Sequence, residues 1–335
     1  MTEPSSILVI QTAFIGDVIL ATGILESLHQ KFPTASIDFL VRKGNESLLK
    51  DHPYLRKVLV FDKKNKYRNL LALIREVRNC RYDLLINVQR FATTGILTVL
   101  SGAKVTVGFN KNPLSVFFTR RVPHHVGEQH EVVRNHQLIS WLTGAAHSRP
   151  RLYPSVPAVE KAQSVRQLPY ITISPASVWH TKQFPADQWV SFIRQLAPSI
   201  NVYLLGSAED APLCEQISST AGRRVVSLAG KLSLLESAAF MREAIMNYVN
   251  DSAPMHLASA TNSPVTAVYC STVPSFGFGP LSDQSFIVET AEKLDCRPCG
   301  LHGFRKCPRG DFRCATGITS SQLHAPIESK PITAA

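Results

Sequence analysis

The sequence predicts an α/β protein built from two doubly wound, Rossmann-like domains. Short apolar runs alternate with stretches of helical period, and this alternation stops at a proline-rich segment and then starts again. A chain of 335 residues also has room for two domains of ordinary size. We expect domains at residues 1–167 and 168–335, with a linker at about residues 148–169.

Each predicted domain contains its own series of strands and helices. In the first, the apolar runs typical of buried strands are Ile7–Gln11, Ile37–Val41, Val58–Phe61 and Leu84–Val88, and the helical stretches are Asp17–Lys31 and Tyr67–Asn79. In the second, the strands are Tyr170–Ser174, Val202–Leu205, Val225–Leu228, Met246–Val249 and Val265–Tyr269, and the helices are Asp187–Leu196, Glu209–Thr220, Ser233–Glu243 and Pro254–Thr261. Such domains bind ligands where their strands end.

The positive charge is confined to the first half of the chain. The net charge is +11, and residues 1–167 carry 23 Lys and Arg against 12 Asp and Glu, whereas residues 168–335 carry 13 of each. This asymmetry indicates an anionic partner, whether nucleic acid, a membrane surface or a phosphorylated substrate, and a merely solubilising surface explains it equally well. With no secretory signal pattern and no run of about 18–20 apolar residues, we expect a soluble cytoplasmic protein.

Residues 11–17, QTAFIGD, form the turn after the first predicted strand. This turn has neither the G-x-G-x-x-G dinucleotide fingerprint nor a phosphate-binding G-K-S/T loop, which disfavours a dehydrogenase. It places Asp17 at a helix start facing the expected ligand edge. A general base and a carboxylate that only complements the helix dipole both fit, and the residues alone favour the second.

Two segments of the second domain have the chemistry of an anion site. Residues 174–185, SPASVWHTKQFP, follow a strand and offer small residues, hydroxyl groups and Lys182, although a solvated surface loop fits equally well. Residues 250–258, NDSAPMHLA, combine a good N-cap at Asp251 or Ser252 with His256 in the first helical turn. Here a diphosphate contact is favoured over a structural histidine.

Taken together in this order, the three segments resemble the ADP-heptose:lipopolysaccharide heptosyltransferases, glycosyltransferase family 9. The matching stretches are ILVIQTAFIGDVILATGILESLHQKFP, SPASVWHTKQFPADQW and NDSAPMHLASA, and a cysteine-bearing tail resembles the heptosyltransferase II branch. The resemblance implies a GT-B fold, with two Rossmann-like domains facing each other across a cleft. It also implies inverting transfer of L-glycero-D-manno-heptose from ADP-heptose to the inner core of Gram-negative lipopolysaccharide, without a metal cofactor.

The resemblance assigns roles residue by residue. Asp17 matches the proposed catalytic base. The positions that match donor-binding residues are Ser177, Lys182, Gly206, Glu209, Leu232, Asp251, Ser252, Ala253 and His256. Ala253 stands where the family pattern D-S/T-G-x-x-H has glycine, and Pro254 after it lacks an N–H group, which puts the donor contacts there in doubt.

With the donor motifs in the neutral second half, the basic first half becomes the expected acceptor side. Arg120, Arg121 and Arg134 are candidates for contacting a Kdo- or heptose-bearing, anionic lipid A acceptor, from charge alone. We therefore expect a monomer that meets the cytoplasmic face of the inner membrane peripherally. Two alternatives remain: a related transferase using another sugar nucleotide or a protein acceptor, and, more remotely, a nucleic-acid-binding protein using the basic half.

The tail carries four cysteines within nineteen residues: Cys296, Cys299, Cys307 and Cys314. Their number suits a structural zinc site, but only one C-x-x-C pair is present where such a site normally has two. Reduced, packed thiols are therefore favoured over zinc or a disulfide.

Overall fold

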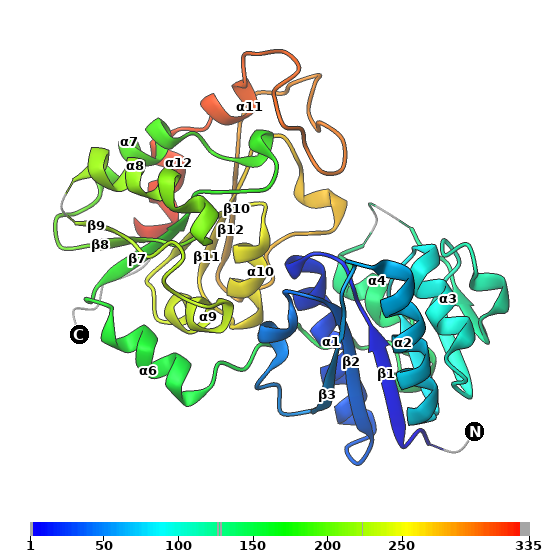
Figure 1. The fold of residues 1–335 in the computed structure, drawn as a ribbon. Coiled ribbons are helices and arrows are strands. Elements are labelled where there is room, and N and C mark those ends of the chain that lie inside the picture. Colours follow the sequence, from blue (N-terminus) through cyan, green and yellow to red (C-terminus); the bar gives the residue numbers. More distant parts are fainter. Residues whose placement is uncertain (1–2, 126, 128, 223, 329–335) are drawn as a thin grey trace. The chain divides into compact units, whose positions relative to one another are not determined.

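The computed structural model describes residues 3–125, 127, 129–222 and 224–328, and it divides into two compact units, Met1–Tyr153 and Pro154–Ala335. Each unit is an α/β structure built on a parallel six-stranded sheet covered by helices (Figure 1). The predicted fold class is confirmed. None of the helices that the described residues form has both the length and the apolar character needed to cross a bilayer.

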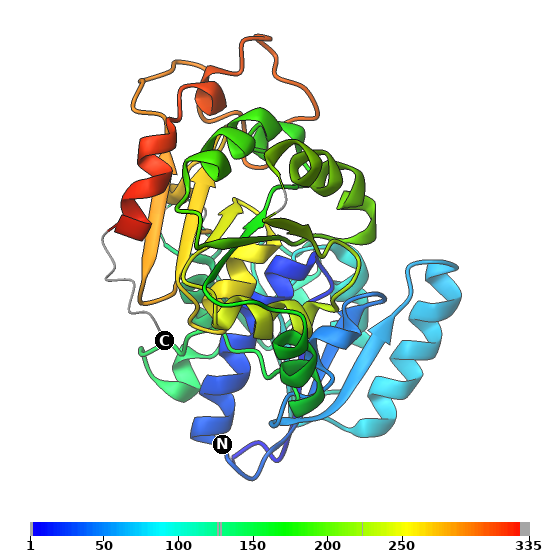
Figure 2. The same ribbon diagram turned by 90° about the vertical axis from the view of Figure 1, so that its left-hand side faces the viewer.

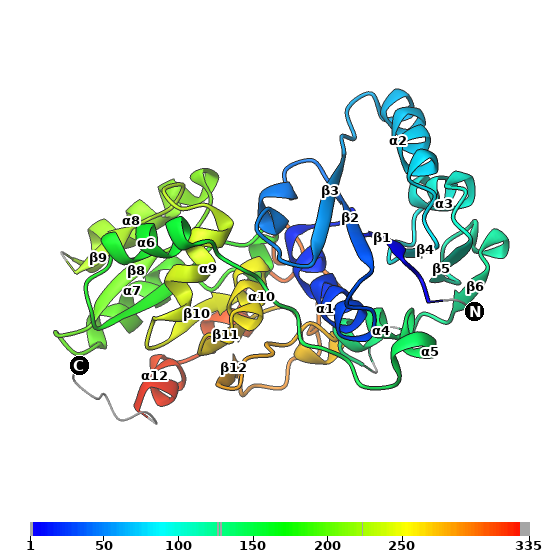
Figure 3. The ribbon, with the colours of Figure 1, turned by 90° about the horizontal axis from the view of Figure 1, so that it is seen from below.

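The first unit has the strand order β3-β2-β1-β4-β5-β6. Its strands are β1 (Ser6–Ile10), β2 (Ser36–Arg42), β3 (Leu55–Phe61), β4 (Leu84–Asn87), β5 (Val105–Phe109) and β6 (Arg120–Val122). Its helices are α1 (Ile15–Lys31), α2 (Lys66–Cys80), α3 (Ala92–Leu100), α4 (Glu131–Gln137) and α5 (Ser140–Thr143), with 3-10 turns η1 (Glu46–Leu49) and η2 (Ser115–Phe117). Figure 3 shows α2 and α3 on one face of the sheet and α1, α4 and α5 on the other.

The second unit repeats this topology with the order β12-β11-β10-β7-β8-β9. Its strands are β7 (Tyr170–Ser174), β8 (Asn201–Leu204), β9 (Val225–Ser227), β10 (Asn247–Asn250), β11 (Val265–Tyr269) and β12 (Ser285–Glu289). Its helices are α6 (Val156–Ser164), α7 (Ala186–Gln195), α8 (Ala211–Ala221), α9 (Leu234–Arg242), α10 (Ala253–Ala260), α11 (Arg313–Thr316) and α12 (Ser320–Glu328), with 3-10 turns η3 (His180–Lys182), η4 (Ala208–Asp210) and η5 (Pro274–Phe276). Helix α12, red in Figure 2, runs beside the edge strand β12.

In both units the first three strands follow one another toward one edge of the sheet, and the fourth strand lies on the other side of the first. These neighbours are β1 and β4 in the first unit and β7 and β10 in the second. Loops leaving adjacent strands in opposite directions open a crevice at the carboxyl edge of a sheet, which is where doubly wound folds bind ligands. Each unit therefore has one expected ligand edge.

The segment predicted as a linker is partly helical. Residues 156–164 form α6, which packs against α9 and is tied to it by the Lys161–Glu236 ion pair at 3.0 Å. The division between units falls after Tyr153, a position inside the segment of about residues 148–169. The prolines favoured a linker over a helix in the prediction. Pro157, however, lies in the first turn of α6, a position that tolerates the missing N–H group.

Candidate functional site

The predicted donor-binding residues all follow strands at the carboxyl edge of the second sheet. Ser177 and Lys182 come after β7, Gly206 and Glu209 after β8, Leu232 after β9, and Asp251, Ser252, Ala253 and His256 after β10. Because β10, β7, β8 and β9 are consecutive neighbours in one parallel sheet, these loops emerge at the same edge. The fold thus brings together residues up to 79 positions apart in sequence.

Lys182 and Asp251 form the central ion pair of this edge. Lys182 Nζ lies 2.7 Å from Asp251 Oδ2, and the two side chains are only 14% and 10% exposed. The Thr272 hydroxyl donates a further hydrogen bond to the same carboxylate oxygen at 2.7 Å. A buried carboxylate held in this way fixes the ammonium group at the sheet edge, where an incoming phosphate can share its charge.

The loop that carries Ser177 and Lys182 is pinned at both ends by one side chain. Asn250, the last residue of β10, donates from Nδ2 to the Pro175 carbonyl at 2.8 Å and accepts at Oδ1 from the Phe184 N–H at 3.0 Å. Within the loop, Gln183 Nε2 donates to the Ser177 carbonyl at 2.6 Å. The buried Asn250 therefore holds Lys182 in register with Asp251, its own neighbour in sequence.

Helix α10 begins at Ala253 with ordinary helical backbone, so this position does not require the glycine of the family pattern. Ser252 occupies the N-cap in extended conformation, and its hydroxyl donates to the Asn250 carbonyl at 3.3 Å instead of capping the helix. His256 is buried in the first turns of the helix. The replacement of the family glycine by Ala253, followed by Pro254, therefore leaves the start of α10 intact, and only the N–H group at position 254 is lost.

Gly206 and Leu232 belong to two loops that are joined to each other. The Gly230 N–H donates to the Gly206 carbonyl at 3.0 Å, and a Cβ atom on Gly206 would lie 2.8 Å from the Cβ of Asp210. Glu209 is exposed on η4, and Leu232 is partly buried. These residues form the β8 and β9 side of the ligand edge.

A segment from the cysteine-bearing tail braces the Lys182 loop, which sequence reasoning missed. The Phe304 N–H donates to Thr181 Oγ1 at 2.7 Å, and the Thr181 N–H donates back to the Phe304 carbonyl at 3.0 Å. Gly303 adopts a φ of +76°, and a Cβ atom there would lie 2.8 Å from Thr181 Oγ1. In the sequence this contact is marked only by Gly303, and a glycine alone does not indicate that it packs against Thr181.

We expect Gly303→Ala to weaken several-fold the binding of the ADP that the family resemblance implies, because the variant displaces Thr181 and, with it, Lys182. The left-handed backbone costs an alanine roughly 1–2 kcal/mol, and the contact with Thr181 adds to this cost. Gly310→Ala is the matched control, since Gly310 has a φ of +78° but open space around its Cβ position. Calorimetric titration with ADP measures the effect. Equal losses in both variants would show that Gly303 does not position the loop.

In the first unit, Asp17 lies in the first turn of α1, directly after β1. Burial raises the pKa of the Asp17 carboxyl, and hydrogen bonds from the backbone N–H groups of Phe14 and of Asp17 itself, with the charges of Arg90 and Arg42, oppose this rise only in part. The backbone hydrogen bonds are those of a carboxylate that complements a helix start, and burial outweighs their effect on the pKa. A buried carboxylate beside a ligand edge also suits a general base, so both predicted roles fit the structure.

A second carboxyl group, Glu131, lies close enough to Asp17 for the two charges to interact, and the sequence analysis missed it. Burial raises the pKa of Glu131, and the charge of Asp17 raises it further while Arg134 lowers it. Arg134 Nη2 and Nε bond Glu131 Oε2 at 2.5 and 2.9 Å, so this carboxylate is committed to its arginine. Among the described residues, the charges of Arg90 and Arg42 act on Asp17 without an ion pair to either.

The three predicted acceptor arginines occupy different environments. Arg134 is only 3% exposed and engaged with Glu131, whereas Arg120 and Arg121 are exposed on the edge strand β6. The Arg120 guanidinium lies over the Trp141 ring at 4.8 Å. Arg120 and Arg121 therefore remain available to an anionic ligand, and Arg134 is placed to hold Glu131.

The four tail cysteines line one cavity of about 250 Å³ and are all free thiols. Burial raises the pKa of Cys299 and raises that of Cys314 to about 12, which keeps both protonated at neutral pH. Among the described residues, no group of three or more His, Cys, Asp or Glu side chains is arranged to hold a metal ion.

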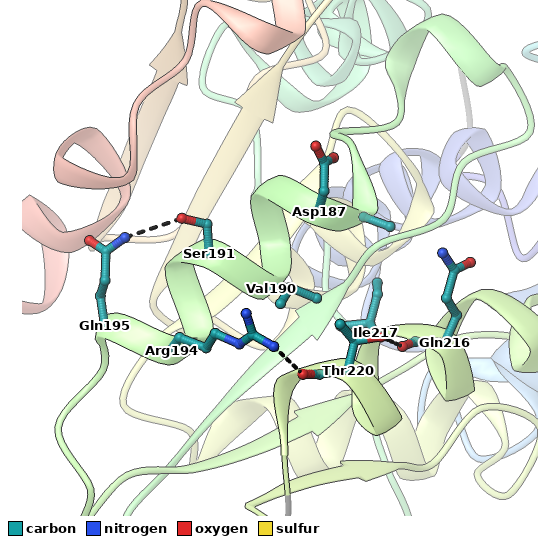
Figure 4. A pocket seen from close by; sticks show the side chains of 9 residues that line it. Asp187, Val190, Ser191, Arg194, Gln195, Gln216, Ile217 and Thr220 are labelled. Carbon is teal, nitrogen blue, oxygen red and sulfur yellow. Dashed lines mark hydrogen bonds between the residues drawn. The ribbon is translucent and has the colours of Figure 1, made fainter.

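A larger cavity of about 440 Å³ lies between α7 and α8. Figure 4 shows it flanked by Arg194, which donates to the Thr220 carbonyl at 2.7 Å, and by Ser191, which pairs with Gln195. It is an open groove between two helices on one face of the sheet. None of the predicted site residues lines it.

Comparison with known proteins finds heptosyltransferases by family model, by sequence and by fold. A family model described as glycosyltransferase family 9 (heptosyltransferase) matches residues 70–301. The lipopolysaccharide core heptosyltransferase OpsX of Haemophilus influenzae is 20% identical, over 98% of this chain and 95% of its own length. The E. coli ADP-heptose lipopolysaccharide heptosyltransferase II has a similar fold, with a TM-score of 0.80 at 20% identity over 97% of this chain and 99% of that one. E. coli heptosyltransferase WaaC, solved with ADP, gives 0.74 at 19% identity with the same coverage.

Proposed function

This chain belongs to glycosyltransferase family 9, the heptosyltransferases, and from that premise we propose that it moves L-glycero-D-manno-heptose from ADP-heptose to the inner core of lipopolysaccharide. It is a glycosyltransferase of two Rossmann-like units with a GT-B fold. The observation that carries the proposal is the Lys182–Asp251 pair on a pinned loop beside the start of α10. That arrangement suits a sugar nucleotide diphosphate.

The proposed mechanism is inverting transfer with Asp17 as base. Its carboxylate takes the proton of the acceptor hydroxyl, whose oxygen bonds to the anomeric carbon as the bond to ADP breaks. Lys182 and the α10 N-terminus stabilise the negative charge that develops on the departing diphosphate. Ser177 and Ser252 bind the donor beside them, Gly206, Glu209 and Leu232 contact the nucleoside, and no metal ion takes part.

The proposed acceptor is an anionic glycolipid carrying Kdo or heptose, held by the basic unit through Arg120 and Arg121. The enzyme would act as a monomer at the cytoplasmic face of the inner membrane, and its cysteine-bearing tail favours the heptosyltransferase II branch. The exposure of both arginines on β6 supports this assignment. The alternative is transfer from another sugar nucleotide or to a protein acceptor.

Product analysis with defined acceptors tests the proposal. We expect ADP release and a heptosylated product from ADP-heptose with heptosyl-Kdo-lipid A, less product with Kdo-lipid A, and unchanged rates in EDTA. UDP- and GDP-sugars serve as donor controls. Preference for one of them, or for a protein acceptor, would favour the alternative, and inhibition by EDTA that added metal reverses would contradict metal independence.

A further inference from the structure

Helix α3 exposes apolar side chains along one face. Ile96, Val99 and Leu100 are 38%, 38% and 43% exposed, and their spacing of three and four residues places them on the same side of the helix. The opposite face is anchored, since Leu97 is buried in the core and the Thr98 hydroxyl accepts from Asn87 Nδ2 of β4 at 2.9 Å. The exposed side chains of Ile96, Val99 and Leu100 therefore belong to a helix whose other face is packed against the core.

The loop that contains η2 lies beside α3 and adds further apolar side chains. Asn112 Nδ2 donates to the Phe91 carbonyl at 3.1 Å, and the Cβ position of Gly95 lies 3.0 Å from Leu114 Cδ1. Two residues further on, Val116 and Phe117 are 64% and 66% exposed. We call the exposed set the apolar patch; it comprises Phe91, Ile96, Val99, Leu100, Val116 and Phe117.

The apolar patch lies in a stretch of sequence without negative charge. Between Asp83 and Glu128 there is no Asp or Glu, and the basic residues in that stretch are Arg90, Lys104 (which pairs with Asp83 at 2.8 Å), Lys111, Arg120 and Arg121. Arg90 directly precedes Phe91, and Lys111 directly precedes the loop that contacts α3. At the other end, Cγ of Arg78 on α2 lies 3.9 Å from the position that a Cβ atom would take on Gly102, just beyond α3.

We propose that the apolar patch and the cations around it dock this enzyme onto an anionic lipid bilayer. Apolar side chains entering the acyl boundary and basic side chains meeting lipid phosphates are the two contributions that hold a peripheral protein on such a surface. Nucleic acid fits less well, because four of the six patch side chains, those of Ile96, Val99, Leu100 and Val116, have no ring on which a base can stack. The inference deepens the proposed membrane contact by naming its surface.

The position of the patch suits a membrane-bound acceptor. Its first residue, Phe91, follows Arg90, whose charge acts on the Asp17 carboxyl. The lipid-facing surface thus begins at the carboxyl edge of the first sheet, where the proposed base lies. A glycolipid whose acyl chains stay in the bilayer could then present its sugars to that edge.

Co-sedimentation of the full chain with vesicles tests the inference. We expect binding to vesicles of phosphatidylcholine mixed with phosphatidylglycerol and much weaker binding to phosphatidylcholine alone. Val116→Ser combined with Phe117→Ser should lower the partition coefficient at least tenfold. Lys111→Glu combined with Arg78→Glu should lower it at least fivefold for each charge, from about 1 kcal/mol per basic residue near the surface.

Matched controls separate the patch from general effects of surface change. Val156→Ser combined with Leu168→Ser removes two exposed apolar side chains of the second unit, and Arg305→Glu combined with Lys306→Glu reverses two exposed charges there. Both should bind vesicles like the wild type. Equal losses in patch and control variants, equal binding to neutral vesicles, or displacement of bound vesicles by an oligonucleotide would overturn the inference.

A soluble, lipid-free acceptor distinguishes failure of this inference from failure of the proposed function. Transfer to it should be unchanged in the Val116→Ser, Phe117→Ser variant. If the patch is wrong, transfer persists while vesicle binding does not depend on the patch. If the function is wrong, transfer is absent while vesicle binding still depends on it.

Discussion

We expect Asp17→Asn to lower the turnover number by about 10²- to 10⁴-fold while leaving ADP binding intact, because a positioned general base contributes roughly that factor. The amide keeps the size of the side chain but cannot take the proton of the acceptor hydroxyl. Steady-state kinetics of ADP release, together with calorimetric titration of ADP, separates the two effects. Turnover within a few-fold of the wild type would refute the assignment of the base.

The same substitution should not cost stability at neutral pH. Burial raises the pKa of Asp17 in the folded protein above its unfolded value, so the folded state binds this proton more tightly. The contribution of Asp17 to stability therefore falls as the pH rises through the window between the two values. Removing the charge should leave the free energy of unfolding at pH 7 unchanged or higher, and in the wild type transfer should fall as the pH drops through the raised pKa.

Glu26→Gln is the matched control for Asp17. Glu26 lies on the same helix and its pKa is also raised by burial, but its carboxylate is held by the Tyr153 hydroxyl at 2.9 and 3.0 Å. It stands more than two turns from Asp17, away from the ligand edge. Its variant should keep turnover, so that loss in both would indicate a general effect on α1.

We expect Lys182→Met to weaken ADP binding by about 10- to 100-fold, the range for losing a hydrogen bond to a charged group of roughly 1.5–3 kcal/mol. Methionine keeps the length and the apolar stem of the side chain but supplies no charge to the diphosphate. Calorimetric titration of ADP and of AMP measures the effect. ADP binding should suffer and AMP binding much less, because AMP lacks the second phosphate.

Losing Lys182 also leaves Asp251 without its cation, so the stability of the variant must be measured alongside. Asp251 keeps the hydrogen bond from Thr272, which limits the cost. Lys293→Met, at an exposed lysine beyond β12, is the control for charge loss alone. A variant at Lys182 that is less stable but binds ADP like the wild type would show that the pair is only structural.

Period and composition were sufficient to predict the fold because the buried strands are long apolar runs. The predicted limits of β7 and β11 agree with the structure residue by residue. The strands that escaped prediction are edge or interrupted ones. Strand β6 is three residues long with two arginines, as suits a protected sheet edge, and β5 contains Gly108, where a Cβ atom would lie 2.6 Å from Phe118.

Candidate site residues that stand in recognisable motifs were predictable from the sequence. Those that only tertiary contacts bring to the site were not. Lys182 and Asp251 stand in recognisable segments, and the parallel sheet brings those segments together. Glu131 could not be found, because nothing in the sequence indicates that α4 packs against α1 and brings this carboxyl within reach of Asp17. Asn250 stands in the sequence next to Asp251, but its two hydrogen bonds across the loop depend on the register of β7 and β10, which the sequence does not indicate.

The bracing of the Lys182 loop by Phe304 has a consequence for translation. The two hydrogen-bonded residues, Thr181 and Phe304, are 123 positions apart. A nascent chain still lacking residue 304 can complete the first unit and strand β7, but it has no support for the loop that follows β7. Ribosome-bound chains halted before that point should therefore fold the basic unit yet fail to retain ADP.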